Sequence, residues 1–417
     1  MSLPRSDTFV NTMRSVKLDL QGNRWLAVVC LLLAANPSFA QTSTKAAQAT
    51  PPPPVAPKKP LVQKEGNVTV EVGVIDNAEY RIDVPDNWNH NLVVFYHGYS
   101  ETPYHFRPGA GMNGQAKPML DRGYAIIQSA YSQTGWALAV AYPETEKLRK
   151  YFVKIHGQPK ETYVAGGSMG GALTMVTIER NPKVYNGALD LCGAVGPTLV
   201  HLNRRFAWRA AFDYYFPGLM PPLNPVPANF VETDALRMKA LAALNAKPAA
   251  ADSMRDLTSL HTNAEVARMM VYFTYVIGDM QDKAGGNPFD NRNTIYTNSS
   301  SDTRTDYALN DGVRRYAADP RARSYLIDNY TPSGKVLKPM LALHTTYDPL
   351  IPANTLTLYN SIVEIAGYSQ NFVQQYVHRE GHCTMSSEEV GRAFDELLLW
   401  VHTGKAPQAG LQRESGR

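Results

Sequence analysis

Residues 161–174 read ETYVAGGSMGGALT, and this stretch decides the fold. An apolar half typical of a buried strand leads to Ser168, which has two glycines on each side and is followed by a helix-like run. Glycine destabilises the interior of helices and strands, so four glycines this close together indicate a local need for small residues. A strand that turns directly into a helix at a serine has that need, because the sharp bend leaves no room for larger side chains and exposes the hydroxyl.

Residues 166–170 also fit the pattern G-x-S-x-G, which favours a nucleophilic Ser168 at the tip of the bend. The alternative is a glycine-rich phosphate-binding loop. That loop has a lysine after its glycines, in the pattern G-x-x-x-x-G-K-[ST], and no lysine stands there. We therefore interpret Ser168 as a nucleophile at a helix N-terminus, where negative charge is favoured.

The segments around this stretch alternate between strand and helix patterns. Residues 68–85 predict an antiparallel hairpin, and the unbroken apolar run of residues 91–98 is typical of a strand buried on both faces. The alternation continues to residue 196, stops over the aromatic- and proline-rich residues 197–335, and resumes over residues 336–403. This order predicts an α/β fold, with a mostly parallel sheet flanked by helices and a large, mainly helical lid inserted before the last two strands.

The N-terminal residues are not expected to join this fold. Residues 1–40 combine basic residues, the short apolar run WLAVVCLLLAA and a small-residue cleavage site after Ala40, as in a secretory signal peptide. The apolar run is well short of the ~20 residues that span a bilayer. Residues 41–67, rich in Ala, Pro and Lys, predict a disordered linker, and residues 404–417 a disordered tail. We therefore expect a periplasmic or secreted protein with no stable membrane anchor after cleavage.

Composition limits the class of protein further. The 417 residues are 44% hydrophobic and 19% charged, which is enough apolar material for a sizeable core. The formal net charge is +4, without the long Lys and Arg runs that are typical of nucleic-acid-binding proteins. No nucleic-acid partner is expected.

A serine nucleophile needs a base, and the base needs an acid that orients it. In a sheet of this kind both are expected at the ends of the last two strands. Asp348 in LALHTTYDPLIP directly follows an apolar strand, and His382 in HREGHCTM follows the last strand. Asp348 could also be an ordinary turn aspartate, and its competitors are lid acids that no strand precedes: Asp282, Asp290 and Asp302. His344 and His378 lie within strands and are expected to be structural.

The oxyanion that forms when serine attacks an ester carbonyl needs backbone donors. We expect one donor to be the amide of Met169 and the other the amide of Tyr99, in the loop after FYHGYS. Candidates for the wall of the substrate site come from YSQTGWA, and ordinary loop packing explains them equally well: Tyr131, Gln133 and Trp136.

Two cysteines, Cys192 and Cys383, would remain after removal of the signal peptide. In an exported protein two cysteines can form a disulfide, or both can be buried thiols. Their number alone leaves both possibilities open.

Taken together, these motifs resemble the α/β-hydrolase superfamily of serine hydrolases. The resemblance covers roughly residues 68–200 and 336–403 and depends on HGYS, GGSMGG, YDPLIP and GHC. It implies hydrolysis through an acyl-enzyme intermediate by a triad of Ser168, Asp348 and His382, with no metal and no organic cofactor.

A finer resemblance, to the tannase and feruloyl esterase family, is partial. In that family a cysteine before the nucleophile forms a disulfide with a cysteine directly after the catalytic histidine. Cys383 follows His382 as in that pattern, whereas Gly167 occupies the position of the first cysteine. The nearest substitute is Cys192, at the end of the strand after the nucleophile helix. The resemblance therefore implies a Cys192–Cys383 disulfide that holds the histidine loop.

These observations predict an exported serine esterase that cleaves carboxylic esters. The aromatic-rich lid suggests an ester with an aromatic or bulky acyl group, and a polymeric ester is as compatible as a small one. A second hypothesis is a serine aminopeptidase or other peptidase on the same fold, which needs lid carboxylates such as Glu232 and Asp234 to hold a substrate amine. A third is a non-catalytic binding protein, and a complete Ser, Asp and His set in the right order argues against it.

Overall fold

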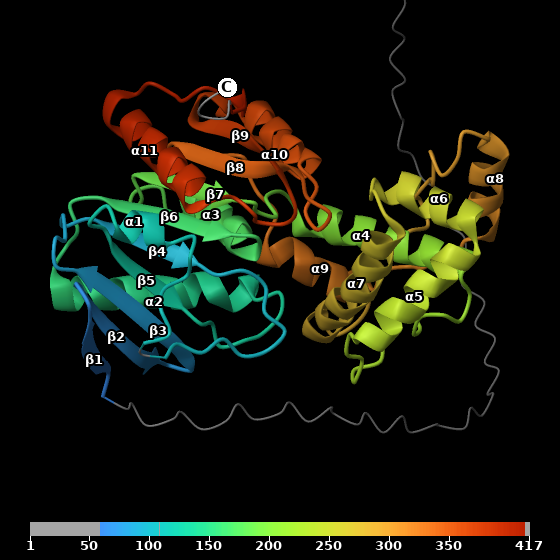
Figure 1. Ribbon diagram of the computed structural model, residues 1–417, viewed down its shortest axis with the longest axis horizontal. Helices are drawn as coiled ribbons and strands as arrows, with labels where there is room; N and C mark the ends of the chain where they lie inside the picture. The colour runs from blue at the N-terminus through green and yellow to red at the C-terminus, as the bar shows by residue number, and fades with distance from the viewer. Residues whose placement is uncertain (1–58, 108, 413–417) are drawn as a thin grey trace, which may run out of the picture. The chain divides into compact units, whose positions relative to one another are not determined.

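A ten-stranded sheet forms the centre of the described chain, residues 59–107 and 109–412 of this computed structural model (Figure 1). Strands β1 to β3 and the pair β3–β5 are antiparallel, and all further neighbours are parallel. In their spatial order the strands are β1 (Leu61–Glu65), β2 (Val68–Ile75), β3 (Ala78–Pro85), β5 (Ala125–Ser129), β4 (Leu92–Tyr96), β6 (Thr162–Gly167), β7 (Gly187–Leu191), β8 (Met340–Tyr347), β9 (Phe372–Glu380) and β10 (Gly410–Leu411).

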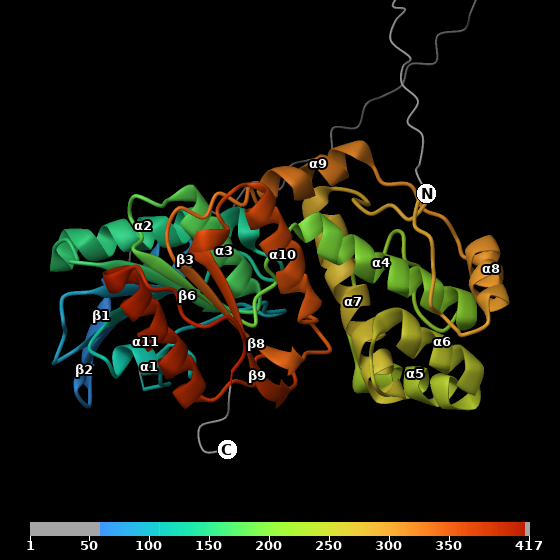
Figure 2. The same ribbon diagram turned by 90° about the horizontal axis from the view of Figure 1, so that it is seen from above.

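Helices cover both faces of the sheet (Figure 2). One face carries α2 (Leu138–His156), α3 (Met169–Arg180) and α10 (Asn354–Ile365), and the other carries α1 (Lys117–Leu120) and α11 (Ser387–Thr403). All five residues of β4 are buried, because alternate side chains enter the two cores. This two-sided burial explains the unbroken apolar run in its sequence. The predicted α/β fold with a mostly parallel sheet is confirmed.

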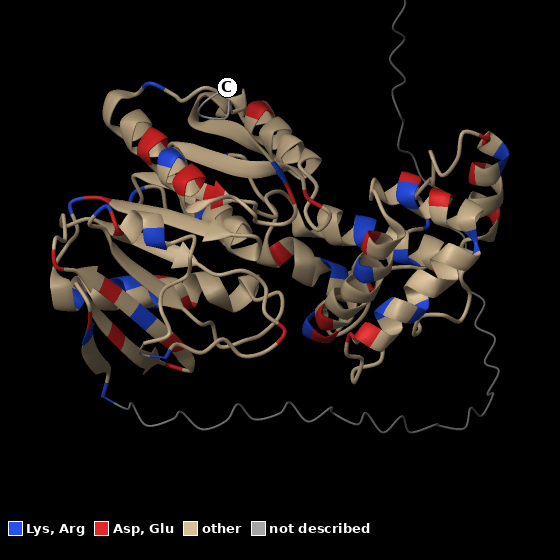
Figure 3. Cartoon of the chain, in the orientation of Figure 1, with Lys and Arg blue, Asp and Glu red and all other residues tan. Residues whose placement is uncertain are grey.

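Helix α11 shows how the sequence pattern forms one of these layers. Its N-terminus has a capping box, in which the Ser386 hydroxyl accepts from the Glu389 amide at 3.2 Å and the Glu389 carboxylate accepts from the Ser386 amide at 2.6 Å. The charged residues of this helix, marked along its ribbon in Figure 3, are exposed or half-buried. Its buried apolar residues recur at helical spacing and pack on the sheet: Val390, Ala393, Phe394, Leu397 and Trp400.

Between β7 and β8 the chain forms a second group of helices, which we call the lid. The lid has its own hydrophobic core, and three further side chains, Tyr99, Trp136 and Leu350, pack against both this core and that of the sheet. These three residues form the apolar joint between lid and sheet. The lid helices are α4 (Thr198–Tyr215), α5 (Asp234–Ala246), α6 (Pro248–Thr258), α7 (Asn263–Ala284), α8 (Thr303–Gly312) and α9 (Pro320–Asn329).

Polar contacts strengthen the same joint. Asp279 in α7 accepts hydrogen bonds from the Trp136 amide at 2.8 Å and from the Tyr99 hydroxyl at 3.4 Å. Lys283, one turn further along α7, forms an ion pair with Asp279 and donates to the Thr134 carbonyl at 2.8 Å. Because Asp279 and Lys283 are mostly shielded from water, these contacts hold α7 against the loop that follows β5.

Two element boundaries differ from the predicted ones. Strand β1 lies within residues 41–67, the predicted linker, and β10 lies within residues 404–417, the predicted tail. Both are edge strands whose residues are mostly exposed or half-buried, so their sequences carry no buried pattern that could signal a strand.

The predicted signal peptide, residues 1–40, lies outside the described residues, as does most of the predicted linker. Within the part of the chain that the structure describes, none of the helices combines the length and the apolar character needed to cross a membrane.

The turn from β6 into α3 is the most confined point of the backbone. Ser168 has φ +60° and ψ −121°, a region that non-glycine residues rarely adopt. A Cβ atom on Gly166 would lie 2.8 Å from the Tyr96 carbonyl oxygen, and one on Gly170 would lie 2.8 Å from the Tyr96 carbonyl carbon. Backbone atoms of a central strand cannot move aside as the end of a flexible side chain can. The glycines are therefore required by the approach of β4.

We expect the substitution Gly170→Ala to lower the free energy of unfolding by about 1–3 kcal/mol, because the added methyl group overpacks the contact with β4. The melting temperature and a urea unfolding curve measure this effect. Gly114→Ala is the matched control, since Gly114 is exposed and its added Cβ would meet no heavy atom within 4 Å. Equal stability of the two variants would contradict the steric argument.

Candidate active site

Three side chains from three different strand ends meet at one edge of the sheet. Ser168 follows β6, Asp348 follows β8 and His382 follows β9. His382 Nε2 lies 2.8 Å from Ser168 Oγ, and His382 Nδ1 lies 2.7 Å from Asp348 Oδ2. With Nδ1–H donating to the carboxylate, Nε2 is left as an acceptor for the serine hydroxyl. The structure thus brings together the three residues predicted as a triad, in the geometry that proton transfer from Ser168 requires.

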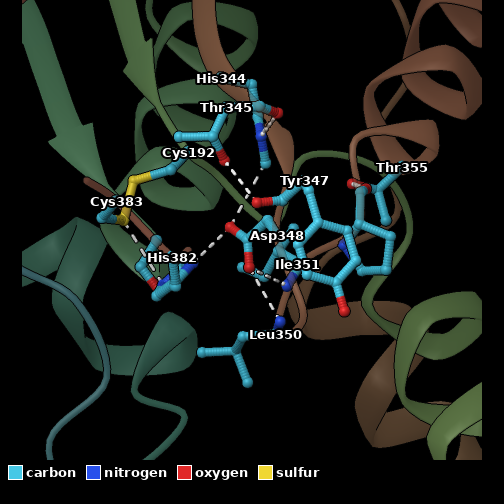
Figure 4. Close-up of polar contacts among 12 residues, drawn as sticks. Cys192, His344, Thr345, Tyr347, Asp348, Leu350, Ile351, Thr355, His382 and Cys383 are labelled. Atoms are coloured by element: carbon cyan, nitrogen blue, oxygen red, sulfur yellow. Dashed lines mark hydrogen bonds and ion pairs between the residues drawn. A yellow bond between two sulfur atoms is a disulfide. The ribbon is translucent and has the colours of Figure 1, made fainter. Parts of the chain in front are cut away.

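Asp348 is buried and uses both carboxylate oxygens (Figure 4). Its Oδ2 faces His382, while its Oδ1 accepts from the amides of Leu350 at 2.8 Å and Ile351 at 2.9 Å. Burial alone would raise the pKa of Asp348, but the hydrogen bond and charge of His382, with the Ile351 amide, hold that pKa below its ordinary value. The carboxylate therefore stays charged and fixed in direction.

His344 packs behind Asp348 in the last half of β8 (Figure 4). It is completely buried, and its Nε2 lies 3.8 Å from Asp348 Oδ2. Its Nδ1 donates to the Thr345 carbonyl at 3.0 Å, and burial lowers the pKa of His344, which keeps the ring neutral. This position agrees with the structural role expected for His344.

The end of β7 and the residues after it form backbone hydrogen bonds with the turn at Ser168. The Ser168 amide donates to the Leu191 carbonyl at 3.0 Å, and the Ala194 amide donates to the Ser168 carbonyl at 3.1 Å. Asp190 is fully buried next to this turn, and burial raises the pKa of its carboxyl group well above the ordinary value, against the Gly193 amide. Sequence reasoning missed Asp190, although a single acid inside the apolar strand GALDL was a signal.

Cys192 and Cys383 form a disulfide with a Cα–Cα distance of 5.3 Å (Figure 4). The bridge joins the end of β7 to the residue directly after His382, as the tannase resemblance implied with Cys192 as the substitute partner. At Gly167, where the first cysteine of that family would stand, the Gln115 side chain covers the backbone, and its Nε2 lies 3.8 Å from Cys192 Sγ. The disulfide partner of Cys383 therefore follows β7, the strand next to β6, instead of standing at residue 167 in β6.

The two residues predicted to supply oxyanion donors both lie beside Ser168. Met169 is the first residue of α3, so its N–H has no acceptor within the helix. The loop that carries Tyr99 passes close by, since a Cβ atom on Gly98 would lie 3.3 Å from the Ser168 Cβ. Their role as oxyanion donors remains a prediction.

His97 braces this loop rather than facing the substrate. Its ring lies between Tyr104 and Tyr131, with ring centroids 4.3 Å and 4.0 Å away, and its Nδ1 donates to the Gly98 carbonyl at 2.7 Å. The Tyr131 hydroxyl donates to the His97 carbonyl at 3.1 Å. Burial lowers the pKa of His97 to about 4, so the ring is neutral near pH 7.

Of the three residues predicted for the substrate wall, the structure brings one to Ser168. Trp136 lines a pocket that also contains Ser168. Tyr131 is buried against His97 instead, and Gln133 is exposed on its loop. Tyr131 thus agrees with the loop packing that was the alternative interpretation, and Gln133 is not among the residues that line the pocket.

Two pockets open beside the triad, both between lid and sheet. The Ser168 pocket encloses about 50 Å³ and is mainly apolar, with walls that include Tyr99, Trp136, Tyr272, Phe273 and Leu350. The His382 pocket is larger, about 270 Å³, and more polar, with walls that include Glu232, Arg237, Arg268, Tyr272 and Leu350. Among the lid residues of these pockets, sequence reasoning named only Glu232, as a candidate to hold a substrate amine. The lid residues on amphipathic helices were missed because they are indistinguishable from residues of the lid core.

Comparison with known proteins agrees with this arrangement in part of the chain. Residues 71–199 match the tannase-like family of unknown function (DUF6351). That range contains Tyr99 and Ser168 and stops before Asp348 and His382. A comparison with curated protein sequences finds no match.

Among solved structures the chain is similar to three esterases. Feruloyl esterase B from Aspergillus oryzae has 11% identity over 83% of this chain and 86% of that chain, with a TM-score of 0.44. A second esterase from Aspergillus oryzae has 12% identity over 82% and 80% of the two chains, with a TM-score of 0.43. An esterase from Pyrococcus furiosus has 11% identity over 82% and 88%, with a TM-score of 0.40.

Fold and site together define the class of protein. The chain has the α/β-hydrolase fold, with a strand–serine–helix turn after β6 and a carboxylate and a histidine after the strands that follow. The tannase-like part of the resemblance is confirmed over residues 71–199, which are less than half of the chain.

We expect removal of the disulfide to lower the free energy of unfolding by about 2–4 kcal/mol, because the bridge restricts the unfolded chain. The double variant Cys192→Ala and Cys383→Ala tests this by urea unfolding. A reductant should lower the melting temperature of the wild type to that of the variant and leave the variant unchanged. Two alkylatable thiols in the denatured, unreduced chain from residue 41 onward would contradict the pairing.

We expect stability to fall between pH 6.5 and pH 4, because burial lowers the pKa values of His97 and His201 to about 4. In the unfolded chain a histidine ring takes up its proton at about pH 6.5, whereas in the folded chain it does so only near pH 4. Each neutral, buried histidine therefore makes its full contribution to the free energy of unfolding above pH 6.5, and this contribution is lost as the pH falls. Between pH 6.5 and 5 the loss is about 2 kcal/mol per histidine.

Urea unfolding at pH 7 and pH 5 measures this loss. His97→Gln should reduce the difference by about 2 kcal/mol, whatever its effect on stability at pH 7. An unchanged difference in that variant would contradict the assignment to His97.

Proposed function

We propose that this protein is an exported serine esterase that hydrolyses carboxylic esters through an acyl-enzyme intermediate. The observation that carries the proposal is the pair of hydrogen bonds from Ser168 Oγ to His382 and from His382 to Asp348, at 2.8 Å and 2.7 Å. A hydroxyl, a base and an orienting acid in this order are the requirements of nucleophilic acyl transfer.

In the first half of the reaction, Ser168 Oγ attacks the ester carbonyl while His382 Nε2 takes the hydroxyl proton. Asp348 stabilises the imidazolium that forms. The amides of Met169 and Tyr99 hold the oxyanion. The intermediate then collapses, His382 returns the proton to the departing alcohol, and the acyl group stays on Ser168. In the second half, His382 activates a water that releases the carboxylic acid.

Each of the two pockets is expected to bind one side of the ester. His382 protonates the departing alcohol, so we place the alcohol side in the pocket that His382 lines and the acyl side in the pocket that Ser168 lines. The small volume of the Ser168 pocket favours a short acyl group. The aromatic or bulky part, which the sequence suggested for the acyl group, is then expected on the alcohol side instead.

Export is part of the proposal. It is supported by the signal-peptide pattern of residues 1–40 and by the disulfide, since disulfides persist in oxidising compartments.

The peptidase alternative needs a free lid carboxylate for a substrate amine. Glu232 and Asp234 were its candidates, and both pair with Arg237, at 2.9 Å and 2.6 Å. Because both acids already form an ion pair with Arg237, we favour the ester reaction over amine-directed peptide cleavage.

We expect Ser168→Ala to reduce kcat for p-nitrophenyl butyrate by at least about a thousandfold, because the nucleophile is lost. Ser361→Ala is the matched control, a surface serine on α10 whose loss should leave kcat unchanged. A fluorophosphonate probe should label the wild type and the control, and not Ser168→Ala.

Aminoacyl p-nitroanilides, assayed under the same conditions, separate the two reactions. Turnover of the anilides without turnover of the esters would replace the esterase by the peptidase. Absence of labelling at Ser168 in the folded protein would favour the non-catalytic hypothesis.

A further inference from the structure

The Ser168 pocket contains a buried cation that the proposed chemistry does not use. Arg205 lies in α4, is only 4% exposed, and lines the same pocket as Ser168. A guanidinium group in a mainly apolar pocket loses much of its hydration, and such a loss is costly unless an anion or several acceptors replace the water.

The protein supplies only partial compensation to this cation. Arg205 Nη2 donates to the Leu350 carbonyl at 3.1 Å, and Nη1 is 3.5 Å from the His201 carbonyl. The guanidinium carbon also lies over two aromatic rings, 4.8 Å from the Trp208 centroid and 5.4 Å from that of Phe273. In the described ranges no carboxylate forms an ion pair with Arg205.

Arg205 nevertheless keeps its charge at neutral pH. Burial, with the neighbouring charge of Arg204, lowers the pKa of Arg205 to about 9, against the opposing effect of Asp348. This pKa is still well above 7. The pocket therefore presents a full positive charge.

Other groups on the pocket wall do not neutralise this charge. His201 Nε2 donates to the Val195 carbonyl at 2.7 Å, and burial lowers the pKa of His201 to about 4, so its ring is neutral. None of the described residues that line this pocket is an Asp or a Glu. An anion that meets Arg205 inside the pocket must therefore come with the ligand.

We propose that Arg205 binds a carboxylate at the far end of the acyl group, so that the substrates are half-esters of short dicarboxylic acids. The proposal rests on the proposed esterase function and names the substrate class of that site. The planar guanidinium group matches a carboxylate in shape and forms charge-assisted hydrogen bonds with it. The reaction consumes the half-ester and water and gives the dicarboxylic acid and the alcohol.

A positioning role is the competing explanation, because Leu350 connects Arg205 to the triad. The Leu350 carbonyl accepts from Arg205, and the Leu350 amide donates to Asp348. If Arg205 only positions Asp348 through Leu350, its loss would slow the hydrolysis of every ester by the same factor. Loss of a carboxylate receptor would slow only the half-esters and raise their KM.

The test compares esters that differ at one end. Ethyl half-esters of succinic, glutaric and adipic acid are paired with ethyl butyrate, valerate and hexanoate, and acid release is followed in a pH-stat. The variants are Arg205→Met, Arg205→Lys and, as the matched control, Arg204→Met. Arg204 is the neighbouring cation in α4, also lies over Trp208, at 5.2 Å, and does not line the Ser168 pocket.

We expect wild type to prefer at least one half-ester over its neutral partner. Arg205→Met should reduce that preference in kcat/KM by about 10- to 100-fold, mainly through KM. Arg205→Lys should keep part of the preference, and Arg204→Met should keep all of it.

Equal loss on both ester series in Arg205→Met, or a wild type that prefers the neutral esters, would overturn this proposal and leave the esterase intact. Failure of the wild type to hydrolyse any ester, together with failure of Ser168 to react with a fluorophosphonate, would instead overturn the proposed function itself.

Discussion

The close approach of three backbone segments at Ser168 is the constraint on which the rest of the structure depends. The end of β4 at Tyr96 presses on the glycines of the turn, while the end of β7 hydrogen-bonds the turn through Leu191 and Ala194. This contact fixes a non-glycine residue at positive φ. It is possible because β4, β6 and β7 are consecutive in the parallel sheet, so that their carboxyl ends lie at one edge. Asp348 and His382 enter the site from the same edge because β8 and β9 continue that order.

The candidate site lies between the sheet and the lid, which have separate hydrophobic cores. The strand ends and the segments directly after them supply the groups of the proposed chemistry. The lid supplies much of both pockets from helices with a core of their own. Tyr99, Trp136 and Leu350 belong to both cores, and Leu350 also holds the carboxylate of Asp348. Leu350 thus connects the lid core with the carboxylate of Asp348 directly.

Sequence predicted the parts of this molecule in which backbone geometry dictates residue type. Glycines around a serine can be recognised because no larger residue fits, and an acid or a histidine after a strand can be recognised because strand order places it. Arg205 could not be found in this way, since an arginine in the amphipathic run RRFAWRA resembles any surface cation until burial is known. For Tyr131 the choice between substrate wall and loop packing stayed open, because period and composition do not show in which direction a side chain points after a strand ends. The edge strands β1 and β10 were missed because their exposed residues carry no pattern of burial.

The disulfide closes a covalent ring of chain from Cys192 to Cys383, and the whole lid lies inside that ring. Asp348 and His382 are within the ring and Ser168 lies outside it, so the bridge is a second covalent route between the nucleophile and its base. A protease that cuts one lid loop would leave both pieces joined beside the triad. Insertions and deletions in the lid lengthen or shorten the ring without loosening this tether. The length of the lid can therefore change while the bridge keeps the end of β7 next to His382.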